Sequence, residues 1–311
     1  MIKIDIYSHI MPEKYFTALI KKVKQVESTV EANCRANVDL RMRFKVMERY
    51  PDVLQVLTLA HPPVETLVPP KQAAELCQIA NDELAELVVK YPDKFVAAVA
   101  CLPMNDMDAA MKELERAIII LKLKGVQISS RINDEPLDSL KFRPLFEAMT
   151  KYDLPIWIHP ATNKLLTRQL FERPFETSGA MERLVAAGIF MDFPTIKIIT
   201  HHCGAMIPYF EGRIQWLMPT MLGKGHTITD PLKHFRHFYA DTATYGSTAA
   251  LVCGITFFGA DHLLFGTDAP LGPKYGLTSG TIDAISRMSI TDTEKKKIYT
   301  ENAIKLLKLA I

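Results

Sequence analysis

Cysteine is scarce in this sequence, with five residues among 311, at positions 34, 77, 101, 203 and 253. The count is odd and no CxxC pair occurs, so the chain is not expected to depend on a disulfide framework. Such sparse use of thiols is typical of a reducing compartment. We therefore predict a cytoplasmic protein.

Long apolar runs are also absent. No uninterrupted stretch of 18 apolar residues occurs, and the first segment, MIKIDIYSHIMPEKYF, carries charges at Lys3 and Asp5. The segment therefore lacks the apolar centre of a signal peptide, and we predict no membrane-spanning helix. Composition is otherwise ordinary, with 48% hydrophobic residues, 14 glycines and 19 prolines, as expected for a globular chain with a large core.

The chain has no marked excess of either charge. Lys and Arg total 37 and Asp and Glu total 35, for a net charge of +2 and no dense basic block. This balance gives no electrostatic footprint for nucleic acid, so no such partner is expected. Two motifs that bind nucleotides are also absent. GxGxxG does not follow the first predicted strand, and GxxxxGK[ST] occurs nowhere in the sequence, so a nucleotide-binding fold is not expected.

Short apolar, β-rich runs recur along the whole chain. Several are apolar at consecutive positions, as is typical of parallel strands buried on both faces. The runs are Lys3–His9, Val53–Leu59, Phe95–Cys101, Gly125–Ser129, Leu154–His159, Ile196–His201, Phe238–Asp241 and Leu263–Thr267.

Helical patterns lie between these runs. They cover Gln72–Lys90, Asp108–Lys122, Leu140–Lys151, Gly179–Ala187 and Thr293–Leu309, whereas the segments Ser28–Arg41, Phe171–Gly179 and Leu222–Pro231 are predicted to be loops. Eight strands alternating with helices predict an α/β fold of the (β/α)8 TIM-barrel type. We expect a single domain over residues 1–311. An open doubly wound sheet is the alternative.

Polar side chains that bind metals stand at four of the predicted strand ends. His9 ends the first run, His159 ends the fifth, His201 ends the sixth and is followed by His202, and Asp268 follows the eighth. In a barrel these ends meet at one mouth, where active sites form. Imidazole and carboxylate are ligands of zinc and similar cations. His9, His159 and Asp268 would supply the three protein ligands of a catalytic metal and leave a histidine for proton transfer.

The order and spacing of several segments resemble one known family. The segments are IDIYSHIMP, RFKVMERYPDVLQVLTL, LPIWIHP, ITHHCGAMIPYFEGRI, LLFGTDAP and ENAIKLLKL, and they span nearly the whole chain. They are similar to the amidohydrolase-2 branch of the amidohydrolase superfamily. The resemblance implies a (β/α)8 barrel with one divalent ion at its mouth, zinc by expectation and manganese as the alternative.

The resemblance also implies roles for individual residues. The ligands of decarboxylase members map onto Tyr7, His9, His159 and Asp268, and their proton-transfer histidine maps onto His202. Tyr7 departs from the family, which has histidine there. Three consequences are open: His9, His159 and Asp268 hold the ion alone, Tyr7 binds it as phenolate, or the ion is weakly bound or lost. His201 is interpreted as a structural, hydrogen-bonded histidine.

Three further residues are candidates for substrate binding. By resemblance, Arg43 and Arg213 map onto arginines that bind a substrate carboxylate, and the counterpart of Arg213 reaches across a dimer interface. A homodimer is therefore expected. His61 follows the second predicted strand and is a candidate from its position alone.

Three functions follow from these observations. The first is metal-dependent decarboxylation of a small aromatic or unsaturated carboxylic acid, with Arg43 and Arg213 binding carboxylate and His202 moving the proton. The second is a hydrolase or hydratase in which Asp268 takes a proton from metal-activated water. The third is a catalytically silent binding barrel, motivated by Tyr7.

Overall fold

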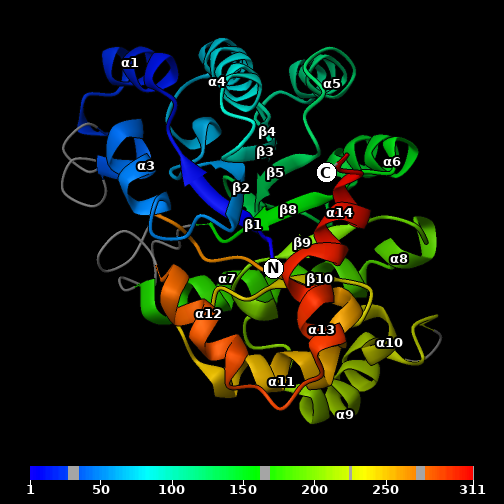
Figure 1. Cartoon of the computed structure of the whole chain (residues 1–311). Coiled ribbons are helices and arrows are strands. Elements are labelled where there is room, and N and C mark those ends of the chain that lie inside the picture. Colours follow the sequence, from blue (N-terminus) through cyan, green and yellow to red (C-terminus); the bar gives the residue numbers. More distant parts are fainter. Residues whose placement is uncertain (27–34, 162–168, 224–225, 271–276, 311) are drawn as a thin grey trace.

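A computed structural model describes residues 1–26, 35–161, 169–223, 226–270 and 277–310 of the chain. Helices surround a central group of strands in this structure (Figure 1). The strands of the central group are β1 (Lys3–Ile10), β2 (Val53–Leu59), β3 (Phe95–Ala98), β4 (Ala100–Cys101), β5 (Val126–Ser129), β8 (Ile156–His159), β9 (Ile198–Thr200), β10 (Tyr239–Asp241) and β11 (Leu263–Leu264).

These strands form a closed parallel ring. Strands β1, β2 and β3 pair in that order, and β4, β5, β8, β9, β10 and β11 pair in a second run. Strands β3 and β4 are two halves of one strand interrupted at Val99, whose amide donates to Leu57 O at 2.9 Å, while the Ala100 amide donates to Gly125 O at 2.9 Å. The chain itself thus joins the two runs.

The seam between the first and last strands completes the ring. The Ile6 amide donates to Phe265 O at 2.9 Å, and the His9 amide donates to Ala269 O at 2.6 Å. Buried Asp5 reinforces the seam, because its carboxylate accepts the Thr267 hydroxyl at 2.5 Å and the Thr267 amide at 3.0 Å. The predicted (β/α)8 barrel is confirmed, and the open-sheet alternative is wrong.

Side chains that face one another across the ring fill its interior. Trp157, on β8, is fully buried, and its indole Nε1 donates to Ile6 O at 3.1 Å. The same cluster holds Ile4, Ile6, Val56, Val99, Ile199 and Leu264 from the strands and Ala303, Leu306 and Leu307 from α14. The barrel is therefore a packed core, and chemistry is confined to its mouth.

The helices largely follow the predicted pattern. Their bounds are α1 (Glu13–Lys22), α3 (Leu40–Met47), α4 (Pro70–Lys90), α5 (Met107–Glu115), α6 (Arg143–Tyr152), α7 (Gln169–Ala186), α8 (Ile189–Asp192), α9 (Glu211–Leu222), α10 (Pro231–Phe235), α11 (Thr248–Phe258), α12 (Thr278–Ser286), α13 (Asp292–Lys296) and α14 (Asn302–Leu307). Single π-helical turns, Arg116–Ile120 and Lys297–Glu301, continue α5 and join α13 to α14. A short hairpin, β6 (Arg131–Ile132) and β7 (Glu135–Pro136), was not predicted.

One predicted loop is wrong. The segment Phe171–Gly179 forms the first half of α7, although it contains Pro174 and Gly179. Its buried side chains recur at helical spacing, with Glu172, Glu176 and Thr177 continuing into Ala180, Met181 and Leu184. Packing of this face outweighs the local helix-breaking signals. Of the predicted loop Ser28–Arg41, positions 27–34 lie outside the described residues and α3 begins at Leu40, and Leu222–Pro231 contains the undescribed positions 224–225.

None of the described helices is long and apolar enough to cross a membrane. The four cysteines in the described part of the chain, Cys77, Cys101, Cys203 and Cys253, are free thiols. A cytoplasmic location stays a prediction from the sequence.

Candidate metal centre

Four polar side chains converge at the carboxyl end of the ring. His9 lies near the end of β1, His159 is the last residue of β8, His201 directly follows β9, and Asp268 follows β11. All four are buried, so each has left water and needs a partner in the protein or a ligand. Neighbouring parallel strands end at the same level, which brings these distant positions together.

Nitrogen atoms of three histidines lie close enough together to bind one metal ion. One ring nitrogen from each of His9, His159 and His201 lies within 4.8 Å of the others, and a second group of that size joins His201, His202 and Asp268. His201, interpreted from sequence as structural, belongs to both groups. The sequence analysis had not included His201 among the candidate metal ligands.

The opposite nitrogen of each ring is already engaged. His9 Nδ1 lies 2.9 Å from Thr58 Oγ1, His159 Nδ1 lies 3.0 Å from Pro160 O, and His201 Nδ1 contacts the Asp241 carboxylate. Partners of this kind fix the ring and leave Nε2 for the metal. His9 Nε2 is buried, and its neighbour at 3.1 Å, Asp268 Oδ1, is itself a candidate ligand. The residues present therefore fit a divalent cation.

Asp268 lies at the centre of the group. Its Oδ1 is 3.1 Å from His9 Nε2 and 3.4 Å from His201 Nε2, and its Oδ2 accepts the Tyr245 hydroxyl at 3.0 Å. A carboxylate and three imidazoles make a ligand set of the kind that zinc and related cations prefer.

Burial and neighbouring charges set the protonation of the group. Burial alone raises the pKa of Asp268, but His201 and His9 outweigh it and hold the pKa well below the usual range. Burial lowers the pKa of His201, yet Asp241 and Asp268 raise it overall to about 9. Burial, with smaller contributions from neighbouring histidines, lowers the pKa of His9 and, further, that of His159. Asp268 is thus a carboxylate at neutral pH.

His202 stands beside this group. Its Nε2 is 4.0 Å from Asp268 Oδ2, and its ring stacks on His201 with centroids 3.9 Å apart. The backbone turns sharply here, with positive φ at His202 (56°), Cys203 (56°) and Gly204 (71°). A Cβ on Gly204 would lie 2.6 Å from the Phe258 ring, so glycine permits both the turn and the close approach of α11.

The Tyr7 hydroxyl is bonded to a backbone carbonyl. The hydroxyl donates to Ile158 O at 3.0 Å, and the ring stacks on His201 with centroids 3.9 Å apart and an interplanar angle of 12°. Burial, followed by Asp241 and Asp268, raises the pKa of Tyr7 well above its usual value. The geometry disfavours Tyr7 as a phenolate ligand and makes it a support for the His201 ring.

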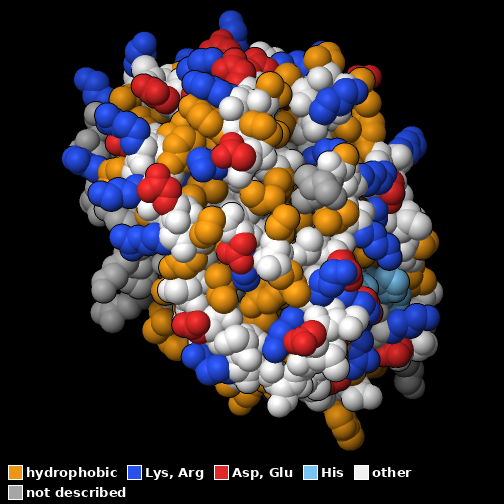
Figure 2. Space-filling model, in the orientation of Figure 1, with side chains coloured by type: hydrophobic (Ala, Val, Ile, Leu, Met, Phe, Trp, Pro, Cys, Tyr) orange, Lys and Arg blue, Asp and Glu red, His pale blue; other side chains and the backbone are white. Residues whose placement is uncertain are grey.

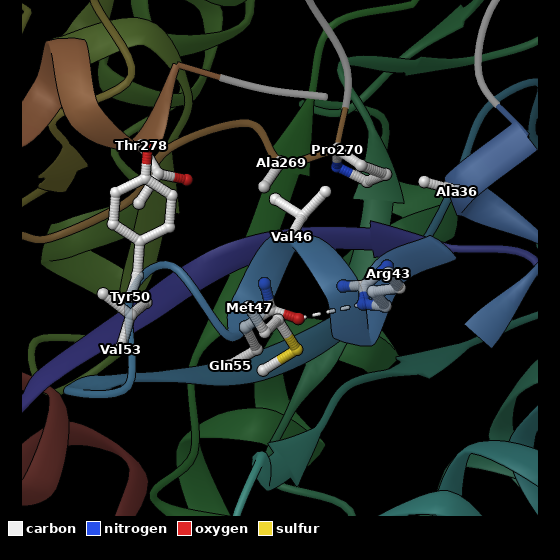
Figure 3. Close-up of a pocket in the computed structure, with 10 residues that line it drawn as sticks. All are labelled: Ala36, Arg43, Val46, Met47, Tyr50, Val53, Gln55, Ala269, Pro270 and Thr278. Carbon is white, nitrogen blue, oxygen red and sulfur yellow. Dashed lines mark hydrogen bonds between the residues drawn. The ribbon is translucent and has the colours of Figure 1, made fainter. Parts of the chain in front are cut away.

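The predicted substrate residues occupy different environments. His61 is at the mouth, where its ring stacks on His159 with centroids 3.6 Å apart. Arg43 is buried, and it donates from Nη1 to His9 O at 2.6 Å and from Nε to Gln55 Oε1 at 2.9 Å. Figure 3 shows Arg43 and Gln55 in a small pocket with Ala269 and Pro270. Arg43 thus braces the backbone of a candidate metal ligand.

Arg213 lies elsewhere. It is exposed on α9 and makes no hydrogen bond or ion pair with any residue that the structure describes. Within one chain, therefore, the described contacts do not bring Arg213 to the histidine group.

The structure adds residues that were not predicted as part of the site. Asp241, at the end of β10, binds His201, and Arg173 lies on α7 beside Pro160. Asp241 ends a predicted strand, which was the available signal. The sequence analysis did not identify Arg173 as a site residue because it interpreted the segment that contains Arg173 as a loop.

Comparison with known proteins agrees with this geometry. The family model described as "Amidohydrolase" matches residues 36–309, which is most of the chain. The chain belongs to this amidohydrolase family. The resemblance seen in the sequence is thereby confirmed.

Relatives in the family carry names that describe one reaction. The chain is 30% identical over 289 residues to a gamma-resorcylate decarboxylase of Rhizobium sp., covering 86% of each chain. A crystal structure of 2,6-dihydroxybenzoate decarboxylase complexed with 2,6-dihydroxybenzoate has a TM-score of 0.82 at 27% identity, covering 99% of this chain and 100% of that one. A dihydroxybenzoic acid decarboxylase from Polaromonas sp. JS666, with bound manganese and 2-nitroresorcinol, has a TM-score of 0.83 at 26% identity, covering 99% and 97%.

Proposed function

We propose that this chain is a metal-dependent decarboxylase of a small aromatic or unsaturated carboxylic acid. The observation that carries the proposal is the group of His9, His159, His201 and Asp268 at the barrel mouth, with three imidazole nitrogens within 4.8 Å of one another and Asp268 in contact with two of them. The names of the relatives support decarboxylation over hydrolysis, because the Rhizobium relative and the two ligand-bound structures given above are named decarboxylases.

The ligand set we propose consists of His9, His159, His201 and Asp268. It departs from the set expected from the resemblance, since His201 takes the place of Tyr7. Imidazole-rich sites with one carboxylate suit zinc, which also binds more tightly than manganese at most such sites. We therefore keep zinc as the expected ion, with manganese as the alternative that a related structure supports.

The residues of this chain divide the work as follows. A bound divalent ion supplies a Lewis acid at the barrel mouth. Burial and the neighbouring His201 lower the pKa of His202 to about 3, so its ring is neutral at neutral pH. At 4.0 Å from Asp268 it is placed to relay a proton from solvent to the substrate carbon, where that proton replaces CO₂. The bond between that carbon and the carboxylate breaks, CO₂ leaves, and the carbon keeps the electron pair and takes the proton. His61, stacked over His159, forms part of the wall against which the substrate lies.

Release of CO₂ tests this function. Protein loaded with zinc, and separately with manganese, should release CO₂ from at least one acid in a panel of hydroxy- and aminobenzoates, and metal-stripped protein should not. A product that retains the carboxylate and gains water would support the hydrolase or hydratase instead. Protein that takes up neither metal and turns over nothing would favour the silent barrel.

We propose a homodimer that uses the exposed face of α9. Trp216 is 81% exposed and Met221 is 71% exposed on this helix, and Tyr209 just before it is 80% exposed. In Figure 2 a hydrophobic side chain projects from the lower edge of the molecule, where Figure 1 places α9. Arg213 lies three positions before Trp216 and so shares this face. A second copy docked here would cover the apolar side chains beside Arg213.

Substitution on α9 is expected to shift the oligomeric state. Trp216→Glu should convert dimer to monomer in sedimentation velocity, because a charge would be buried against apolar surface. Val89→Glu on α4, where Val89 is 82% exposed, is the matched control and should leave the dimer intact. A parent protein that sediments as a monomer at all concentrations would contradict the proposal.

A further inference from the structure

Arg173 of α7 is held at the edge of the metal centre. Its Nη1 donates to Pro160 O at 2.5 Å, and the same carbonyl oxygen lies 3.0 Å from His159 Nδ1. The guanidinium and the imidazole of a proposed ligand therefore share one backbone atom. This anchor fixes one end of a planar, five-donor group and leaves its other donors available.

In the described part of the chain, Arg173 makes no direct ion pair, although Glu172 and Glu176 on the same helix act on it through space. Among the described residues, none of the Asp or Glu oxygens lies within ion-pair distance of the Arg173 nitrogens, and the Pro160 carbonyl is its one hydrogen-bond partner there. Arg173 is only half-exposed, and burial lowers its pKa. A partly buried guanidinium that no carboxylate touches gains free energy when an anion binds its remaining N–H donors.

The charge of Arg173 reaches the mouth of the barrel. After burial, it is the largest cause of the low pKa of His61, and it also contributes to lowering the pKa of His159 and His202. In the other direction, after burial, Glu172 acts most strongly on Arg173 and raises its pKa, followed by Asp268 and Tyr245 at the barrel mouth. The side chain thus lies near both sides of the site, whereas Arg43 is occupied by His9 O and Gln55.

We propose that Arg173 binds the carboxylate of the substrate. A guanidinium held at one nitrogen presents the rest of its fork to an anion, and paired N–H···O bonds to a carboxylate orient it as well as attract it. The inference rests on the proposed function and narrows it, since it makes an anionic carboxylate next to His159 the feature that the site recognises. It also transfers to Arg173 the role that the sequence suggested for Arg43.

Binding of an acid and of its decarboxylated counterpart tests this role. Calorimetry on zinc-loaded protein would compare 2,6-dihydroxybenzoate, salicylate and benzoate with resorcinol, which lacks the carboxylate. Arg173→Met should weaken binding of the acids by at least about tenfold and leave resorcinol unchanged, while Arg173→Lys should fall between. Arg143→Met is the matched control: Arg143 pairs with Asp192 on other helices, so acid binding should stay at the parent level.

Several outcomes would overturn the inference. Equal losses for acids and resorcinol would indicate a structural role for Arg173, as would loss of bound zinc in both Arg173 variants. Failure of the zinc-loaded parent to bind any of the acids would also overturn it. The measurement is independent of turnover, so selective acid binding that depends on Arg173 would stand even if no CO₂ were released. Conversely, CO₂ release with an unchanged KM in Arg173→Met would overturn this inference alone.

Discussion

Replacing His201 with alanine is expected to weaken metal binding by roughly 100-fold or more, whereas Tyr7→Phe should leave it unchanged. Loss of an outer partner of a ligand already costs about 10- to 100-fold, and loss of a ligand should cost at least as much. The His201 ring offers a nitrogen within 4.8 Å of those of His9 and His159, while the Tyr7 hydroxyl is bonded to Ile158 O. Competition with a chromophoric chelator, with metal content by mass spectrometry, measures the difference.

A control is needed because His201 also contacts buried Asp241. Thermal unfolding of the metal-free proteins would show whether His201→Ala is destabilised, and His201→Gln keeps a hydrogen-bond donor for Asp241 without the imidazole. X-ray absorption of the zinc-loaded parent should indicate three imidazole ligands. The assignment would be wrong if Tyr7→Phe lost the metal and His201→Gln kept it.

Asp268→Asn is expected to lower kcat/KM by roughly 1,000-fold or more once the reaction is established. The substitution keeps the shape of the side chain but removes the negative charge opposite His9 and His201, so both the metal and the adjacent His202 lose their anionic partner. Tyr245→Phe removes only the hydrogen bond to Asp268 Oδ2 and should cost about tenfold. Steady-state kinetics at saturating zinc would measure both.

Comparing Asp268→Asn with Tyr245→Phe distinguishes a residue that takes part in the reaction from one that only positions it. Tyr245 is a positioning residue, so its loss should reduce kcat with little change in metal content, whereas Asp268→Asn should reduce both. Activity of Asp268→Asn within tenfold of the parent would remove Asp268 from the proposed mechanism. A Tyr245→Phe effect as large as that of Asp268→Asn would show that the tyrosine itself contacts the substrate.

The strands were predictable because burial on both faces gives each of them an apolar run that few other structures produce. The prediction Val53–Leu59 coincides with β2, and Phe95–Cys101 covers β3 and β4 together. The helix α7 was missed because Pro174 and Gly179 are local signals, while the packing that stabilises the helix comes from distant parts of the chain.

The site residues that could be predicted from the sequence are those at the ends of predicted strands. His9, His159 and Asp268 meet because parallel strands in a barrel end at one mouth, which follows from topology alone. The choice between His201 and His202 was not accessible from the sequence. The alternation of a strand ends where β9 stops, and the positive φ at His202 then turns its ring onto that of His201. Arg173 could not be found without α7, and the engagement of Arg43 by His9 O depends on side-chain packing.

The seam of the barrel has a consequence for how this chain emerges from a ribosome. One edge of β1 can pair with β2 early in synthesis, but its other edge waits for Phe265 and Ala269, some 260 positions later. Until then the nascent sheet has two open edges of the kind that invite pairing with other chains. His9 and Asp268 lie on opposite sides of this seam, so an unfinished chain carries histidines but no complete site. Closure of the ring and binding of the proposed ion therefore both wait until the segment from Phe265 to Ala269 has been made.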